Sequence, residues 1–366
     1  MKQGRFATLN DLETEVMRQS IAKEDALVNT QCMEYTVDGS FQHMSVVDRE
    51  SKKSLLQVPM NDIAHQQLGS YLDIPSKYYN RMRQEDPQLL AVNINNWLQR
   101  REPEQRLIRM LDGRMRAFLS NSYNLLENDR ILYMVLPILK RLGSDAQVES
   151  CEITERRLYI KVVNRRIQAE VTPGDIVQSG VIITNSEVGM GSVTVKPLVY
   201  RLVCKNGMVI NDAVQRTVHK GSRKVSSMDF TVYKEDTVAA QTEALYKEIR
   251  DSVDSAISQV VIDKVTQRYR AAKKMEITGN IPALVTMTRK EFKLREDEEE
   301  KVMEHLYQGR DYSLYGLSNA ITRASQDIAD YDRATDLESI GYNVLTMPHK
   351  QWERLNVAKE SQLVAA

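Results

Sequence analysis

The sequence predicts an α+β protein with a helical N-terminal part, an antiparallel-rich β middle followed by a long helix, and a helical C-terminal part. Apolar residues recur at helical spacings up to residue 142 and again after residue 238, and between these points they alternate with the period of a strand. A chain of 366 residues also exceeds what one hydrophobic core usually supports. We therefore expect three regions, at residues 1–145, 146–275 and 276–366.

The N-terminal region is expected to be mostly helical. Its first 30 residues are polar and weakly periodic, which indicates a loosely docked helix. Apolar spacings of two to four then continue the helical pattern from Pro59 to Leu142. Asn128 suits the cap of the last helix in this region, Gly143 suits its end, and Pro137 predicts a kink or a break.

Residues 63–82 predict a helix, a turn and a second helix. The second helix would carry Lys77, Tyr78, Arg81 and Arg83. This is the order of a DNA-binding helix-turn-helix module, although helix pairs of this kind are also common in domains that never touch DNA. Both interpretations stay open at this point.

The middle region carries the strands and is expected to form a β-rich core with a basic face. Residues 148–171 predict two strands with a turn near Asn164, and residues 173–175 predict another turn. The stretch GVIITNSEVGMGSVTVKPLVYRLVCKNGMVI, residues 180–210, predicts two or three more strands and a tight turn at Asn206–Gly207.

The pattern returns to helix after the strands. From Val238 to Lys274 one apolar stripe predicts a long helix that packs on one face of the sheet. The C-terminal region is expected to be helical, with turns at Gly309, Gly316 and Gly341.

No catalytic constellation is recognisable. Gly189 and Gly191 lack both the spacing of a dinucleotide loop and the Lys-Ser/Thr of a P-loop, so we expect them to shape strands. The five histidines are scattered, and no cysteine lies within zinc spacing of another. Cys204, beside Lys205, is expected to be a core strand residue and not a reactive thiol. We expect a protein that is not an enzyme and that needs no cofactor and no metal.

The charge of the chain is segregated although its formal net charge is zero. Residues 156–224 hold twelve cations against four acids, whereas residues 291–304 hold seven acids against three bases. The candidate nucleic-acid-binding residues are Arg156, Arg157, Lys161, Arg165, Arg166, Lys196, Arg201, Lys205, Arg216, Lys220, Arg223 and Lys224. With Tyr159, Tyr200 and Tyr233 among them, they suit a single-stranded nucleic acid, whose phosphates need cations and whose bases can stack. The alternative is a sheet whose outer face is basic and solvated.

Four segments resemble a known family: LGSYLDIPSKYYNRM, RMLDGRMRAFLSNSYNLLENDRIL, GVIITNSEVGMGSVTVKPLVYRLVCKNGM and YGLSNAITRASQDIADYDRATDLESIG. They are similar to phage- and plasmid-borne proteins known only as a domain of unknown function, over residues 55–345. This resemblance implies a mobile-element setting and no activity that transfers residue by residue. The order of strands, hairpin, strands and long helix also resembles the core of single-strand annealing proteins of the lambda Beta type. Those proteins form rings or filaments and hold the DNA backbone in a basic groove.

The expected function is therefore that of a non-enzymatic single-stranded DNA-binding protein of a phage or plasmid, acting in annealing, replication or recruitment. Expected partners are single-stranded DNA, further copies of the chain, and replication, recombination or transcription proteins. No apolar run approaches the roughly 20 residues of a membrane span, so no membrane is expected. The three distant cysteines, Cys32, Cys151 and Cys204, indicate a reducing compartment, which is the cytoplasm (that of the host if a phage encodes the protein).

Two alternatives belong to other classes. The first is an interaction protein that inhibits or redirects a host system, with the acidic segment near Glu296 mimicking or blocking a nucleic-acid site. The second is an enzyme whose site the sequence does not reveal. A deep pocket lined by Asn185, Glu187 and Tyr200 would favour the enzyme.

Overall fold

A computed structural model describes residues 4–6, 8–39, 41–48, 50–51, 53–142, 145–212, 215–217 and 235–357. Helices dominate both ends of the chain and antiparallel sheets its middle, which confirms the predicted α+β class. Within the described residues, no helix combines the length and the apolarity needed to span a bilayer.

A seven-stranded sheet forms the centre of the molecule, in the order β1-β8-β9-β10-β11-β12, with β13 also paired to β11. All of its pairings are antiparallel. Its strands are β1 (Gly4–Phe6), β8 (Ala146–Ile153), β9 (Leu158–Glu170), β10 (Ile176–Asn185), β11 (Val193–Arg201), β12 (Asn206–Val209) and β13 (Gln215–Thr217). The strands predicted for the middle of the chain are therefore present.

The turn expected near Asn164 is wrong. The chain turns between β8 and β9 at residues 154–157, and Asn164 lies inside β9. Residues 165–167 bulge there, between the pairs Asn164–Ser179 and Gln168–Gln178. A bulge and a turn interrupt the apolar alternation in the same way, so the pattern does not separate them.

The tight turn expected at Asn206–Gly207 is also displaced. These two residues begin β12, and the turn before them places Lys205 in the left-handed region, at φ +50°. Asn206 is buried, and its side-chain amide donates a hydrogen bond to the hydroxyl of Thr322. A contact with a distant helix thus overrides the local turn preference.

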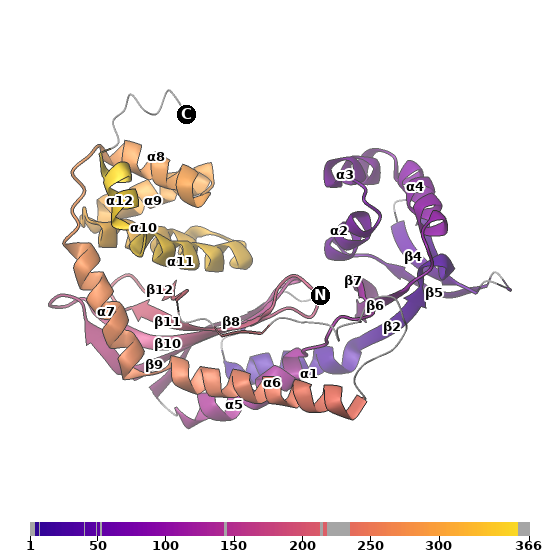
Figure 1. Cartoon of the computed structure of the whole chain (residues 1–366), viewed down its shortest axis with the longest axis horizontal. Coiled ribbons are helices and arrows are strands. Elements are labelled where there is room, and N and C mark those ends of the chain that lie inside the picture. Colours follow the sequence, from indigo (N-terminus) through magenta and orange to yellow (C-terminus); the bar gives the residue numbers. More distant parts are fainter. Residues whose placement is uncertain are drawn as a thin grey trace.

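Helices cover both faces of the central sheet (Figure 1). Three helices pack on one side, which we call the α6 face: α1 (Leu9–Ala22), α5 (Asn128–Arg141) and α6 (Glu235–Ala256). Helix α11 (Tyr331–Leu345) packs on the other side, which we call the α11 face; there Tyr331 contacts Tyr159 and Ile182.

The predicted long helix is two helices. Helix α7 (Gln259–Lys273) follows α6 along the α6 face, and the hydroxyl of Ser258 caps it by accepting the backbone N–H of Val261 at 3.4 Å. Serine is a preferred N-cap because its oxygen satisfies an unpaired helix N–H. Helix α5, in contrast, continues through Pro137 without a break.

The N-terminal part contains two small sheets that the sequence analysis did not predict. One orders β2-β6-β7 and the other β3-β4-β5. Their strands are β2 (Lys23–Asn29), β6 (Gln105–Leu111), β7 (Arg114–Ser120), β3 (Met33–Asp38), β4 (Phe41–Val47) and β5 (Ser54–Pro59). Asp112 and Gly113 join β6 to β7 with φ of +51° and +70°. Asp-Gly is a preferred dipeptide of tight hairpins, and a β-hairpin therefore stands where the apolar spacing predicts a helix.

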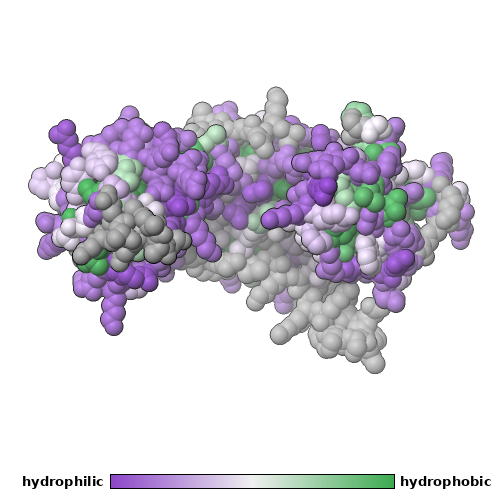
Figure 2. All heavy atoms as spheres, turned by 90° about the horizontal axis from the view of Figure 1, so that it is seen from above, coloured by the Kyte–Doolittle hydropathy of each residue, from purple (hydrophilic) through white to green (hydrophobic). Residues whose placement is uncertain are grey.

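The remaining helices of the N-terminal part are α2 (Asp62–Tyr71), α3 (Ser76–Glu85) and α4 (Pro87–Arg100), with the short 3-10 helix η1 (Thr30–Cys32). They lie on the same side of the central sheet as the C-terminal helices, at its opposite end (Figure 1). Apolar residues gather over this part when the molecule is seen from above, whereas the C-terminal helices are mostly hydrophilic there (Figure 2).

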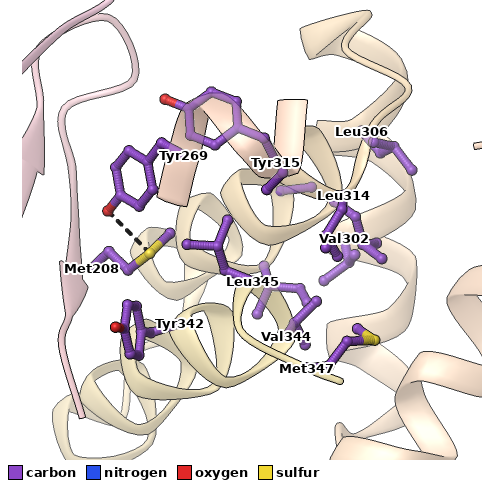
Figure 3. Packing of buried hydrophobic residues seen from close by; sticks show 14 of the residues in the cluster. Met208, Tyr269, Val302, Leu306, Leu314, Tyr315, Tyr342, Val344, Leu345 and Met347 are labelled. Atoms are coloured by element: carbon purple, nitrogen blue, oxygen red, sulfur yellow. Dashed lines mark hydrogen bonds between the residues drawn. The ribbon is translucent and has the colours of Figure 1, made fainter. Parts of the chain in front are cut away.

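The C-terminal part is helical, as expected: α8 (Ile281–Phe292), α9 (Glu296–Gly309), α10 (Leu314–Ala324), the 3-10 helix η3 (Ser325–Asp327), α11 and α12 (His349–Asn356). Its core meets the sheet where Met208 lies between Tyr269 and Tyr342 (Figure 3), and the Tyr269 hydroxyl donates to the Met208 sulfur at 3.1 Å. Gly309 ends α9, but the turns expected at Gly316 and Gly341 are wrong. A Cβ at Gly341 would lie 2.3 Å from Cγ2 of Thr322, so this glycine allows α10 and α11 to pack closely.

Candidate functional site

A cavity of about 650 Å³ lies between the α11 face of the sheet and helix α11. Its floor comes from β10 and β11, where Thr184 pairs with Thr194 and Ile182 with Lys196. Because side chains alternate across a strand, the threonines and the lysine point to one face. The two threonine hydroxyls are 2.7 Å apart and share a hydrogen bond.

The opposite wall is a polar stripe of α11. Thr335, Ser339 and Asn343 recur every four residues, which places them on one side of the helix. A chain of hydrogen bonds crosses from the floor to this wall: Lys196 Nζ donates to Asn211 Oδ1 at 3.0 Å, and Asn211 Nδ2 donates to Asn343 Oδ1 at 2.7 Å. The cavity is thus lined by hydroxyl and amide groups that can both donate and accept.

A second cation, Arg157, closes one end of the cavity. Its Nε and Nη2 donate to the carbonyl of Met190 at 3.1 and 2.7 Å. Gly191 leaves room for the guanidinium, because a Cβ there would lie 2.9 Å from Arg157 Nε. Burial raises the pKa of the cavity carboxyl, Asp336, and the charge of Arg157 offsets part of that rise. No acid lies within ion-pair distance of Arg157 in the described part of the chain.

Lys161 belongs to the same sheet face but is fully engaged. Its ammonium is buried, donates to Glu338 Oε2 at 2.7 Å and to Thr335 Oγ1 at 3.1 Å, and lies 4.7 Å from the ring centre of Tyr331. Burial alone would lower its pKa, but the charge of Glu338 and the neighbouring Tyr331 leave the pKa above its ordinary value. Lys161 therefore anchors α11 to the sheet and presents no charge to solvent.

The other described cations are spread over the sheet and not gathered with Lys196. Arg201 points to the α6 face and forms an ion pair with Asp175, Nε to Oδ1 at 2.6 Å. Arg165 donates to Gln147, and Arg166 forms an ion pair with Asp145.

Two further candidate cations, Arg156 and Lys205, are exposed in turns at opposite ends of the sheet. Arg216 lies on β13, of which the structure describes the backbone. Lys220, Arg223 and Lys224 lie outside the described residues.

The tyrosines expected to stack on bases are not available for that role. Tyr159 is 1% exposed and donates from its hydroxyl to Asp332 at 2.6 Å, and Tyr200 is 7% exposed within the same cluster. Tyr233 lies outside the described residues. Neither described ring can meet a base without unpacking the core.

A buried ionic cluster joins the N-terminal part to the central sheet, and the sequence analysis missed it. Arg109 on β6 is fully buried; it donates to Asp25 at 3.0 Å, to Glu127 at 2.6 Å and to the carbonyl of Glu187 at 2.9 Å. Arg116 on β7 donates to the Glu187 carboxylate at 3.0 Å. The signal that could have revealed this cluster is an arginine flanked on both sides by apolar residues, as in Ile108-Arg109-Met110 and Met115-Arg116-Ala117.

The pKa values of two carboxyl groups in the cluster, those of Glu127 and Glu187, are shifted in opposite directions. Burial and the neighbouring Glu187 raise the pKa of Glu127 to about 7. Burial alone would raise the pKa of Glu187, but the charge of Arg116 and a hydrogen bond from Glu127 lower it. Oxygens of Glu127, Asp129 and Glu187 lie within 4.8 Å of one another, and the ammonium of Lys23 lies among them, at 2.8 Å from Glu127 and 3.3 Å from Asp129. A lysine thus takes the place that a metal cation would need.

The acidic segment near Glu296 and the residues named for an enzyme pocket are engaged in contacts within the fold. In the acidic segment, Glu298 is buried and pairs with Arg333, Oε1 to Nε at 2.6 Å, while Glu299 pairs with Arg289. Asn185 donates to Leu126 O and to Asn128 on the α6 face, whereas Tyr200 lies on the α11 face, so the pocket proposed for an enzyme does not bring them together.

The helix pair expected at residues 63–82 is present as α2 and α3. Lys77, Tyr78 and Arg81 are exposed on α3, and Arg81 pairs with Glu85. Arg83 pairs with Asp62 of α2 at 2.8 Å, so this cation ties the two helices together.

The fold and the site together define an α+β protein whose antiparallel sheet carries a polar, two-cation cavity under a C-terminal helix. Residues 117–341 match the family described as domain of unknown function DUF932, and the chain belongs to this family. The match includes every residue of the central sheet from β8 onward and most of α11. No curated protein and no solved structure matches the chain.

Proposed function

We propose that the protein binds single-stranded DNA without catalysing a reaction, and that the cavity on the α11 face receives part of the DNA backbone. The observation that carries this proposal is the pairing of Arg157 and Lys196 with hydroxyl and amide groups in one cavity of about 650 Å³. Arginine, lysine, threonine, serine and asparagine are the side chains that contact phosphates in protein–DNA complexes.

The chemistry of the cavity favours backbone over base recognition. Two cations and several neutral donors outweigh the one carboxyl of the lining, Asp336, so the cavity suits a singly charged phosphodiester. The described tyrosines of the sheet, Tyr159 and Tyr200, are buried, so stacking would add little. Binding should therefore depend on salt and hardly on sequence.

We further propose that the protein serves a phage or plasmid in the cytoplasm of its host, in annealing, replication or recruitment. Further copies of the chain and proteins of replication, recombination or transcription are the proposed partners. The support for this setting is the likeness to phage- and plasmid-borne proteins and to the strand–hairpin–helix order of annealing proteins.

Fluorescence anisotropy with a labelled single strand and its duplex, at several salt concentrations, tests the proposal. We expect preference for the single strand and a log–log salt slope of about −0.7 for each neutralised phosphate. Replacing both cavity cations, Arg157→Gln with Lys196→Gln, should flatten that slope by about 1.4. Lys264→Gln, at an exposed position of α7, is the matched control and should keep the wild-type slope. Salt-independent binding, or equal slopes in all three proteins, would refute the proposal.

A further inference from the structure

A second cavity, of about 510 Å³, lies between the turn that joins β11 to β12 and helices α9 and α10. Cys204 and Lys205 line it from the turn, and Asn319 and Arg323 line it from one side of α10, four residues apart. This cavity shares no lining residue with the cavity on the α11 face. The inference below is therefore independent of the proposed function.

Two positive charges in this cavity are uncompensated within the described part of the chain. Arg323 is half-buried and its guanidinium makes neither a hydrogen bond nor an ion pair there; the ammonium of Lys205 is exposed and likewise has no acid within 4 Å. The other charged groups are paired: Arg201 binds Asp175, and the carboxylate of Asp311, which also lines the cavity, lies 3.6 Å from the ammonium of Lys273. The imidazole of His305 lies 2.6 Å from Asp327. The guanidinium of an arginine presents a planar fork of donors that matches carboxylate and phosphate oxygens, so Arg323 is available to an anion that enters the cavity.

The turn is held in place before any ligand arrives. Gln326 donates to the carbonyl of Lys205, and Arg201 Nη1 donates to the sulfur of Cys204 at 3.0 Å. Lys205 itself has a left-handed backbone, at φ +50°. Because the turn is fixed against the C-terminal helices, little ordering entropy is lost when a ligand binds.

We propose that this cavity binds a small phosphate monoester. The two free cations match a dianion, and the side chains of Gln308 and His305 add further polar groups to the lining. A bare oxyanion would leave most of the cavity unfilled, and the apolar side chains of Leu306 and Ala320 offer space for an organic group. The carbonyl end of α9 opposes an anion at the rim, but a helix end carries about half a charge against the two full charges of the side chains.

Cys204 gives a local readout of binding. The chain has three cysteines, of which Cys151 is buried and Cys32 and Cys204 are partly exposed. Alkylation by iodoacetamide, followed by peptide mass spectrometry, reports both exposed thiols in one sample. Ribose 5-phosphate should slow the modification of Cys204 and leave that of Cys32 unchanged, whereas ribose should protect neither.

Variants connect this protection to the two cations. Arg323→Gln should weaken binding, so that the concentration of ribose 5-phosphate needed for half-maximal protection rises about tenfold or more, since a hydrogen bond to a charged group is lost. Lys205→Asn places a residue that tolerates the left-handed backbone, and it should raise the half-protecting concentration as well. Arg130→Gln, at an exposed position of α5, is the matched control and should have no effect.

A 5′-phosphorylated oligonucleotide compared with its 5′-hydroxyl form separates a free metabolite from a strand end as the source of the phosphate. Protection by the phosphorylated strand but not by ribose 5-phosphate would assign the cavity to strand ends, with the same chemistry. The proposal fails if no phosphorylated probe protects Cys204, or if protection is the same in Arg323→Gln, Lys205→Asn and wild type.

Discussion

The carboxylate of Glu187 accepts a hydrogen bond from Nη1 of Arg116 at 3.0 Å, although 71 positions separate the two residues in the chain. This contact links β7 of the N-terminal part to the end of β10 in the central sheet. Both side chains are buried, at 6% and 5% exposure, and the backbone carbonyl of Glu187 accepts a second arginine, Arg109. The attachment of the N-terminal part is therefore ionic as well as apolar.

Removing the Glu187 charge should destabilise the protein strongly. Glu187→Gln leaves Arg116 buried without its counter-charge, and breaking a buried pair in this way costs about 3–5 kcal/mol. Chemical denaturation measures the change in unfolding free energy. Glu13→Gln, which breaks an exposed pair with Lys140, is the control and should cost less than about 1 kcal/mol. Equal costs for the two variants would contradict the structural role of Glu187.

Stability should depend on pH through Glu127. Its pKa is raised from 4.5 to about 7 in the folded protein, so the folded state holds this proton more tightly than the unfolded state. The stabilisation is complete below pH 4.5 and is lost as the pH rises towards 7. The unfolding free energy of the wild type, relative to Glu127→Gln, should fall by about 1 kcal/mol or more between pH 5 and 7. A constant difference across this range would show that Glu127 does not titrate there.

Lys161 and Glu338 should act as a pair in stability and not in DNA binding. Lys161→Met alone leaves the Glu338 carboxylate buried without the counter-charge of Lys161, at an expected cost of about 3–5 kcal/mol. The double variant Lys161→Met/Glu338→Leu should recover most of this loss, because two apolar side chains can replace a buried ion pair. The folded double variant should bind single strands with the wild-type salt slope. A flattened slope would instead mean that Lys161 reaches the DNA.

Gly189 should matter for folding and not for ligands. It has φ of +73°, and a Cβ there would lie 2.7 Å from Cδ2 of Leu119. Gly189→Ala is therefore expected to cost about 1 kcal/mol or more in thermal or chemical unfolding. Gly309→Ala, where a Cβ meets nothing within 4 Å, should be neutral or slightly stabilising. Loss of ligand affinity in folded Gly189→Ala would contradict the prediction.

Arg223 and Lys224, which lie outside the described residues, remain candidates for backbone contacts. Changing both to alanine should flatten the salt slope of single-strand binding by about one to two units and leave folding intact. The variant Arg156→Ala with Arg157→Ala removes a cation of the α11-face cavity instead. Comparing the salt slopes of the two variants separates the contribution of residues 223–224 from that of the cavity. If the Arg223/Lys224 variant keeps the wild-type slope and loses a protein partner, the segment belongs to a protein interface.

The sequence predicted the sheet well because strand periodicity is a local property. The strands expected within residues 148–171 and 180–210 are present as β8 to β12, and residues 158–163 of β9 are buried on both faces of the sheet. The hairpin at Asp112–Gly113 differs from the helix that the apolar spacing around it predicts, although Asp-Gly is a strong signal for a tight turn.

The site was harder to predict because charge counts do not say where a side chain points. Lys161 and Lys196 lie on the same face, yet they have different roles. Glu338, 177 positions away in the chain, binds Lys161, whereas Lys196 lines the cavity and donates to Asn211. Arg201 faces the other side, with Asp175. The local excess of cations therefore overstated how many of them could meet one ligand.

The position of α11 bears on protein synthesis. All residues that form the floor of the α11-face cavity have been synthesised once the ribosome reaches Asn211. The wall, with Ser339 and Asn343, and the partner of Lys161, Glu338, are synthesised more than 120 residues later. Until then the nascent chain holds a sheet with one uncovered face and a lysine that has no carboxylate. Domains generally fold as units during translation, and uncovered sheet faces invite aggregation. A premature stop codon before residue 331 should therefore yield an insoluble product that chaperones retain, and not a shorter protein with partial binding.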